Sequence, residues 1–285
     1  MNDTSPSRGR FVRMFSRLRR HRVGRIGLAL VALLVVTALA GPWIAPHDPS
    51  VIDYGAVLAP PDLTYLLGTD EIGRDILSRV IEGSRVSLEV VALSMALAFA
   101  AGSLIGMLSG YFGGAVDEII MRVMDGLLAF PTLVLALAIV AVLGPSLVNA
   151  IIAISIVNTP GFARLVRGQV LVVRELEYVQ AARALGAADW QVMLRHVWPS
   201  VVGNVIVYAS LRGSTAIITE SSLSFLGLGV QPPTPSWGGM LATGMQYLDA
   251  WWMSIFPGAA IFLAILGLNF LGDGLRDALD SRLSD

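Results

Sequence analysis

The sequence of 285 residues contains no lysine and no cysteine, and all 20 of its basic residues are arginine. A P-loop ATPase needs a lysine in its phosphate-binding loop, and disulfides and thiolate metal sites need cysteine, so this chain has none of these sites. Charged residues are also scarce, at 14%, whereas 55% are hydrophobic and the mean hydropathy is +0.70. One soluble core cannot bury so much apolar surface, so we expect a lipid bilayer around the chain. The formal net charge of -1 gives no indication of a nucleic-acid partner.

Long uncharged intervals predict an all-α membrane protein with six transmembrane helices. Residues 26–44 would form a helix of about 29 Å, which matches a hydrocarbon core of ~30 Å. The uncharged interval 126–163 is too long for one span, and Gly144-Pro145 is expected to divide it into two. The remaining helices are expected over residues 86–110, 202–223 and 254–271.

The arginines predict how these helices are oriented. With the N-terminus in the cytoplasm, sixteen arginines lie on the cytoplasmic side, three lie outside, and Arg212 lies within a span. This positive-inside bias places both termini in the cytoplasm. The expected organisation is then a tail 1–25, a first helix 26–44, an external segment 45–85, a five-helix core 86–272 with a cytoplasmic loop 164–200 and an external segment 227–253, and a tail 273–285.

The N-terminal region also has features of a cleavable secretory signal, namely a basic stretch, an apolar run and the small residues Ala38 and Ala40. However, the apolar run is longer than a usual signal core, and cleavage would leave the two ends on opposite sides of the membrane. We therefore expect an uncleaved first helix.

A charged segment, residues 177–199, lies between two predicted spans on the cytoplasmic side. Gly186 is expected to take a positive φ angle and to join two short helices, and Pro199 is expected to end the second one. Taken alone, this composition is equally compatible with an amphipathic helix on the lipid surface.

The 177–199 segment resembles the coupling loop of ABC importer permeases, whose pattern is Glu-Ala-Ala, three residues, Gly, nine residues, Ile-x-Leu-Pro. Gln180, His196 and Trp198 replace the Glu, Ile and Leu of that pattern. The resemblance implies that this segment contacts a separate ATPase. The residues it assigns to this contact are Glu177, Gln180, Ala181, Ala182, Gly186 and Pro199.

Residues 67–79, 223–238 and 271–280 resemble the dipeptide, oligopeptide and nickel group of these permeases, and the extra first span resembles the second permease of the pair. This implies the type I ABC importer permease fold in a bacterial plasma (inner) membrane. The expected partners are a second related permease in a heterodimer, two ATPase subunits that carry ATP and Mg, and an external substrate-binding protein. No cofactor is expected on this chain, and it would not be an enzyme. Peptides are the expected substrate, with nickel or another small solute as the alternative.

The fifth span is the most polar and is the candidate translocation pathway. A charge at membrane depth costs at least ~2.5 kcal/mol, so such groups face a bundle interior or water. Arg212 is expected either to meet a substrate carboxylate or to pair with an acidic residue of the partner permease. The candidate pathway residues are Tyr208, Arg212, Thr215, Thr219 and Glu220. An ion-coupled secondary transporter is the less favoured alternative, because it would carry charges or histidines in several spans.

Two further sets of residues have an expected structural or binding role. The external residues Asp70, Glu71, Arg74 and Asp75 are expected to form either a docking face for the binding protein or a polar cap over helix ends. Glycines recur every four residues in the second span and are expected to let another helix approach closely. These glycines are Gly102, Gly106 and Gly110.

Overall fold

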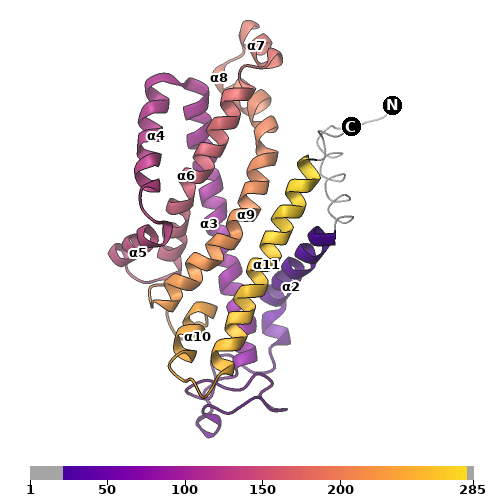
Figure 1. The fold of residues 1–285 in the computed structure, drawn as a ribbon, viewed down its shortest axis with the longest axis vertical. Coiled ribbons are helices and arrows are strands. Elements are labelled where there is room, and N and C mark those ends of the chain that lie inside the picture. Colours follow the sequence, from indigo (N-terminus) through magenta and orange to yellow (C-terminus); the bar gives the residue numbers. More distant parts are fainter. Residues whose placement is uncertain (1–21, 281–285) are drawn as a thin grey trace.

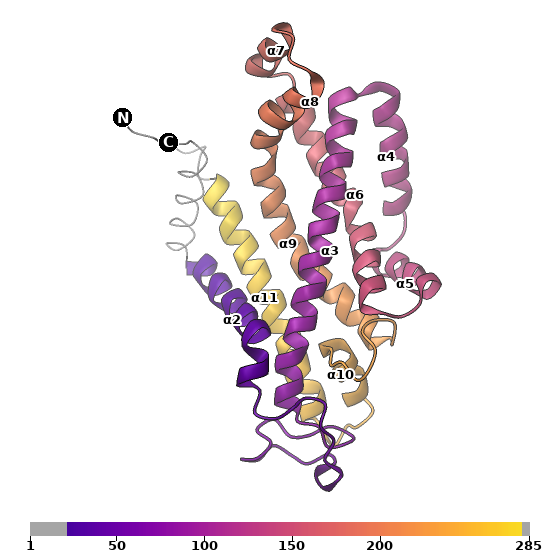
Figure 2. The ribbon, with the colours of Figure 1, turned by 180° about the vertical axis from the view of Figure 1, so that it is seen from behind.

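The computed structural model describes residues 22–280, and within that range it is built of helices without a β-strand. Long helices run along the length of the molecule, with α7 and α8 at one end and α10 at the other (Figures 1 and 2). We call these the α7 end and the α10 end. The helices are α2 (Arg22–Ile44), α3 (Ile76–Phe112), α4 (Gly114–Leu128), α5 (Thr132–Leu143), α6 (Leu147–Val173), α7 (Glu177–Ala184), α8 (Asp189–Gln191), α9 (Trp198–Phe225), α10 (Trp237–Gly244) and α11 (Trp252–Asp280).

Five helical stretches are long and apolar enough to cross a membrane. A sixth crossing arises if α4 and α5, which are bent by 91° at a short break, are counted as one span. The predicted all-α membrane fold is therefore confirmed. The five stretches are Val23–Ile44, Ile76–Phe112, Leu147–Val173, Asp189–Phe225 and Trp252–Ala278.

The third predicted span differs in shape, and the first ten residues of the expected loop 164–200 are helical. In the structure, α4 already begins at Gly114, the break falls just before α5 at Pro131, and α6 continues to Val173. Both features have one cause, because charged residues of α4 and α6 pair across the two helices. Arg164 lies 2.5 Å from Asp125, and Arg167 makes two hydrogen bonds of 2.5 and 2.6 Å to Asp117. Paired charges can remain within helices, so charge-free intervals underestimate helix length.

Two other helix ends differ from the prediction. α3 begins at Ile76 rather than near Val86 and has 37 residues, which corresponds to about 56 Å. Pro199 does not end a helix but lies in the first turn of α9. The preceding residues Val192–Val197 form a π-helical turn, in which the backbone N–H of Trp198 donates to the carbonyl of Met193. Proline lacks an N–H, and this wider turn leads into α9 without requiring one from Pro199.

α3 packs closely against α6, and the three glycines of α3 lie at this contact. A Cβ added at Gly110 would lie 2.9 Å from the Cβ of Val170, and one at Gly106 would lie 2.8 Å from the Cβ of Val166. Ordinary contacts lie at 3.4–4 Å, so only glycine permits this approach. α3 and α6 therefore form a tightly packed pair.

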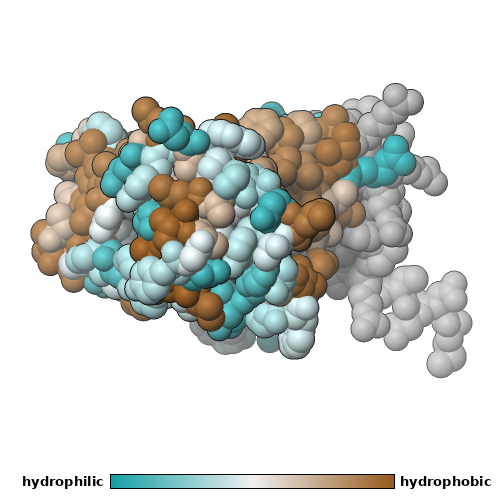
Figure 3. Space-filling model, turned by 90° about the horizontal axis from the view of Figure 1, so that it is seen from below, coloured by the Kyte–Doolittle hydropathy of each residue, from teal (hydrophilic) through white to brown (hydrophobic). Residues whose placement is uncertain are grey.

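Large apolar side chains cover the outside of the bundle between its two ends. Leu39 of α2 is 68% exposed, Val142 of α5 is 86% exposed and Phe262 of α11 is 61% exposed. Seen from the α10 end, pale and teal residues cover much of that end while brown apolar residues lie around the sides (Figure 3). This distribution suits helices surrounded by lipid with a polar end facing water.

Candidate functional site

The 177–199 segment projects beyond the bundle at the α7 end (Figure 1). Gly186 has a φ of +82°, and the backbone N–H groups of Gly186 and Ala187 donate to carbonyls in the last turns of α7. These bonds close α7 and turn the chain toward α8, as expected for a glycine just after a helix. The predicted pair of short helices joined at Gly186 is present.

This segment has one buried and one exposed apolar face. Val179 and Val192 are fully buried against the bundle, whereas Leu185 is 88% exposed, Trp190 is 55% exposed and Leu194 is 59% exposed. Of the residues expected to contact an ATPase, Ala182 is half-buried and the other five are exposed. The segment therefore presents large apolar side chains beyond the end of the helix bundle.

Gln180 stands where the coupling-loop pattern has a glutamate, and its neighbours explain this difference. The Gln180 amide nitrogen lies 3.3 Å from the carbonyl oxygen and 3.4 Å from a carboxylate oxygen of Glu175. A glutamate at this position would face a second carboxylate, and like charges at this distance repel. A neutral amide donor therefore suits this neighbour.

Sequence reasoning missed the residues that attach this segment to the bundle. The hydroxyl of Tyr111, at the end of α3, donates to a carboxylate oxygen of Asp189 at 2.7 Å, and the guanidinium of Arg183 lies 4.5 Å from the Tyr111 ring centroid. Arg174 donates to the carbonyl of Gly110 at 2.8 Å. These partners are far apart in the sequence, and the only available signal was an aromatic residue at the end of an uncharged run.

The polar residues of α9 separate into two groups. Arg212 donates to the Tyr208 hydroxyl at 2.7 Å, and both side chains lie against Gly161 of α6, where a Cβ would be 3.2 Å from the guanidinium. Within residues 22–280 no carboxylate forms an ion pair with Arg212. Arg212 and Tyr208 are half-buried, and Thr215 is exposed. Tyr208 and Arg212 thus form one polar unit on the side of α9 that faces α6.

Glu220 belongs to a different environment from Arg212. It is 1% exposed, and its carboxylate accepts a hydrogen bond of 2.8 Å from Ser224 and longer ones of 3.4 and 3.5 Å from Ser221 and Ser87. Because Ser87 lies on α3, these bonds connect α9 to α3 inside the chain. Thr219 is also buried, and its hydroxyl donates to the carbonyl of Thr215.

At the α10 end, Asp70 and Asp75 are only 3% and 2% exposed, which favours the alternative of a polar cap over helix ends for these two residues. Asp70 accepts a hydrogen bond of 2.6 Å from Arg74 and lies 3.4 Å from Arg79, and Asp75 caps the N-terminus of α3. The side chains of Arg74 and Glu71 retain 12% and 22% exposure. These charges mainly hold the turn before α3 in place, because Asp70 and Glu71 pair with Arg74 and one carboxylate oxygen of Asp75 caps α3.

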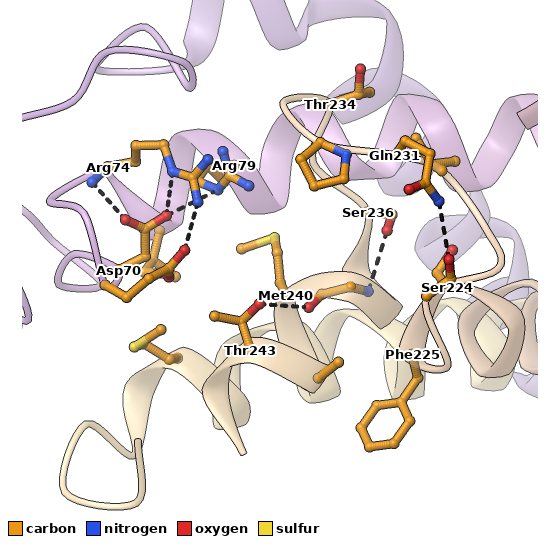
Figure 4. Close-up of a pocket in the computed structure, with 18 of the residues that line it drawn as sticks. Asp70, Arg74, Arg79, Ser224, Phe225, Gln231, Thr234, Ser236, Met240 and Thr243 are labelled. Atoms are coloured by element: carbon orange, nitrogen blue, oxygen red, sulfur yellow. Dashed lines mark hydrogen bonds and ion pairs between the residues drawn. The ribbon is translucent and has the colours of Figure 1, made fainter. Parts of the chain in front are cut away.

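A cavity of about 440 Å³ lies between this turn and the segment that leads into α10. Figure 4 shows Asp70, Arg74 and Arg79 on one side and Gln231, Thr234 and Ser236 on the other, with Met240 between them. Two indole N–H groups hold the walls together, from Trp237 to the carbonyl of Val80 at 2.9 Å and from Trp252 to the carbonyl of Thr69 at 3.0 Å. Within residues 22–280 there is no group of three His, Asp or Glu side chains that could hold a metal ion.

Comparisons with known proteins agree with this architecture. Residues 102–285 match the family described as binding-protein-dependent transport system inner membrane component, and residues 9–61 match the N-terminal TM domain of oligopeptide transport permease C. The chain is 48% identical to the probable D,D-dipeptide transport system permease protein DdpC of Escherichia coli K12, over 89% of this chain and 85% of that protein. It is 46% identical to the di/tripeptide transport system permease protein DppC of Pseudomonas aeruginosa, over 93% and 90% of the two chains. It is 44% identical to the glutathione transport system permease protein GsiD of Pectobacterium atrosepticum, over 93% and 89%.

These matches cover the 177–199 segment, all of α9 and the α10 end. The chain therefore belongs to the family of binding-protein-dependent transport system inner membrane components, and it is a non-catalytic, multi-pass membrane subunit of an ABC transport system.

Proposed function

We propose that the chain forms half of the translocation pathway of an ATP-driven importer for short peptides. Its partners are a second related permease, two ATPase subunits that bind ATP and Mg, and an external substrate-binding protein. The named substrates of its relatives, D,D-dipeptides, di- and tripeptides and glutathione, support this substrate class.

The observation that carries the proposal is the position of Arg212. It stands at the middle of the 28 residues of α9, and within the described chain its guanidinium bonds to a tyrosine hydroxyl rather than to a carboxylate. An arginine at membrane depth needs a polar or charged partner, and the carboxylate of a peptide can supply one. At 4 Å and an effective dielectric constant of ~20, a doubly charged metal ion would be repelled by about 8 kcal/mol. Arg212 therefore favours peptides over nickel.

The 177–199 segment supports coupling to the ATPases. Its exposed side chains Leu185, Trp190 and Leu194 lie beyond the bundle, and a groove on a soluble partner would bury them. The alternative of a helix on the lipid surface fits less well, because α7 lies beyond the ends of the long helices rather than beside the bundle (Figures 1 and 2).

The arginines support an orientation with the α7 end in the cytoplasm of a bacterium. Arg164, Arg167, Arg174 and Arg183 all lie in or next to the elements of that end. The polar α10 end would then face the binding protein, and the cavity beside Arg74 and Gln231 could receive a side chain of that protein.

The test is uptake by the complete transporter in proteoliposomes, with dipeptides, tripeptides, glutathione and Ni²⁺ compared. We expect ATP-dependent peptide uptake, and Arg212→Gln should reduce uptake at least tenfold while the amount of assembled complex stays unchanged. Arg122→Gln is the matched control, because Arg122 lies at an exposed pair with Glu118. Uptake of Ni²⁺ but not of peptides would overturn the substrate class. Loss of the assembled complex in Arg212→Gln would instead assign Arg212 to an ion pair with the partner permease.

A further inference from the structure

We propose that Tyr111 is a positioning residue that carries the movement of the 177–199 segment into the α3–α6 pair. The inference rests on the proposed function, in which ATPase subunits move this segment. The chain already joins the segment to α9, through the continuous helical stretch Asp189–Phe225, and to α6, which ends at Val173. Tyr111 adds a contact with α3, which has no such chain connection to the segment.

The Tyr111 side chain contacts both helices of the segment. Its hydroxyl donates to Asp189, the first residue of α8, at 2.7 Å. Its ring faces the guanidinium of Arg183, in the last turn of α7, at 4.5 Å. These two residues stand on opposite sides of the turn at Gly186. Tyr111 therefore holds the two arms of the segment in a defined position relative to the end of α3.

A second set of contacts reaches the same turn of α3. Gln180 bonds to Glu175, Glu175 pairs with Arg174 at 3.0 Å, and Arg174 donates to the carbonyl of Gly110 at 2.8 Å. The Glu175 side chain is 63% exposed, and surface pairs of this kind hold little energy. Tyr111 is only 5% exposed, so its contacts are the less easily replaced of the two sets.

The end of α3 cannot move without α6. Gly110, next to Tyr111, is the last of the three glycines that bring α3 against α6, and a Cβ there would lie 2.9 Å from Val170. A displacement of Tyr111 is thus passed to both helices together. α6 in turn carries Gly161, which faces Tyr208 and Arg212 of α9.

The chain itself joins the segment to α6, through residues 174–176, and to α9. These connections leave the angle between the segment and the α3–α6 pair free to change, whereas the Tyr111 contacts fix it. If the Tyr111 contacts are lost, the ATPases can still move the segment, but part of that movement turns it about residues 174–176 instead of displacing α3, α6 and Gly161 relative to Arg212. ATP would then be hydrolysed with less transport.

The experiment measures ATP hydrolysis and peptide uptake in the same proteoliposomes containing the complete transporter. Tyr111→Phe removes the hydrogen bond to Asp189 but keeps the ring and its contact with Arg183. The loss of one hydrogen bond to a charged group should raise the ATP hydrolysed per peptide by about tenfold or more, with the amount of complex unchanged. Asp189→Ala removes the same hydrogen bond from its exposed partner. The double variant Tyr111→Phe/Asp189→Ala should hydrolyse no more ATP per peptide than either single variant.

Tyr65→Phe is the matched control. The Tyr65 hydroxyl also donates to a carboxylate, at 2.9 Å to Asp53, but it lies in the segment between α2 and α3, far along the chain from residues 177–199. The amount of ATP hydrolysed per peptide should equal that of the wild type in this variant. The proposal is overturned if Tyr111→Phe leaves this ratio unchanged, if it acts only by reducing the amount of complex, or if Tyr65→Phe raises the ratio equally. A wild-type chain that assembles with no ATPase would refute the proposed function itself, which is a separate result.

A second measurement does not depend on the substrate. Because the chain has no cysteine, Ala184→Cys on α7 and Leu104→Cys on the exposed side of α3 introduce a unique pair of spin-label sites. In the wild-type background we expect one narrow distance distribution with and without ATP, because the segment and α3 move together. Tyr111→Phe should broaden it, and an unchanged distribution would count against the proposal.

Discussion

Replacing Gly106 by alanine should destabilise the protein by forcing α3 and α6 apart. The new Cβ would lie 2.8 Å from the Cβ of Val166, 3.0 Å from the backbone nitrogen of Arg167 and closer still to the carbonyl oxygen of Ala163. Two of these three atoms belong to the backbone and cannot rotate away, so the helices must separate until the contacts reach at least 3.4 Å. Overpacking of this kind costs about 1–3 kcal/mol. At roughly 2–4 °C per kcal/mol, the melting temperature should lie about 2–12 °C below that of a helical Gly→Ala variant that has no such clash.

Gly168→Ala is the control for this prediction. Gly168 lies on α6 and is exposed, and a Cβ there would meet no atom within 4 Å. It gains the same helix propensity, about 1 kcal/mol, without the steric clash. The difference between the two variants therefore isolates the steric cost. The assay is thermal unfolding of the full-length chain in detergent, followed by circular dichroism. A melting temperature for Gly106→Ala equal to or above that of Gly168→Ala would refute the close packing of α3 on α6.

Three further predictions concern other parts of the chain. Gly186→Trp should leave the complex inserted and assembled but abolish transport, because the φ of +82° disfavours a side chain and the indole would obstruct a partner. The control is Gly144→Trp, which has a similar φ of +92° but lies away from the segment. Normal uptake by Gly186→Trp would contradict the coupling role. Glu220→Ala should lower the free energy of unfolding by about 1–3 kcal/mol, because it leaves buried serine hydroxyls without their acceptor. Glu220→Gln keeps an acceptor and should be tolerated. Equal unfolding midpoints for the two variants would contradict this role of Glu220. The hydrogen bond that the Tyr65 phenol donates to Asp53 raises the pKa of Tyr65 above 10.0. Asp53→Asn should therefore lower the pKa of Tyr65 in a spectroscopic titration, in which Tyr65→Phe identifies the signal of this tyrosine. An unchanged pKa of Tyr65 would contradict the contact.

The fold was largely predictable because lipid imposes a simple rule on sequence. Uncharged runs of membrane length lie within all five long apolar stretches but did not reveal the bent pair α4 and α5, and glycines at a spacing of four marked the face of α3 that meets α6. The helix ends were misplaced where charged side chains pair with one another and can therefore remain within a helix. Asp117 and Arg167 are 50 residues apart in the chain, and no local pattern reveals that they neutralise each other and let α4 and α6 extend.

The geometry of the candidate coupling segment was predictable where the pattern is local. The position of Gly186 and the two short helices around it follow from spacing and backbone geometry alone. The contact of Tyr111 was not predictable, because its partner Asp189 is 78 residues away and a tyrosine at a helix end has many structural roles. The burial of the charged residues near the start of α3 was not predictable for a similar reason, since only the folded turn brings Arg79 beside Asp70 and buries both.

The pathway hypothesis depends on separating two charged residues that the sequence places together. Glu220 and Arg212 lie two helical turns apart on the same polar helix, and either could serve the pathway on composition alone. Glu220 has three serine hydroxyls around it and is almost fully buried, so its hydrogen bonds are made within the chain and connect α9 to α3. Arg212 is half-buried, and within residues 22–280 its side chain donates a hydrogen bond only to the Tyr208 hydroxyl, at 2.7 Å. A buried group whose bonds are complete stabilises the helix that carries it, whereas a guanidinium with unused donors can bind another molecule. The two residues therefore have different roles, and the transport hypothesis applies to Arg212 and Tyr208 rather than to Glu220.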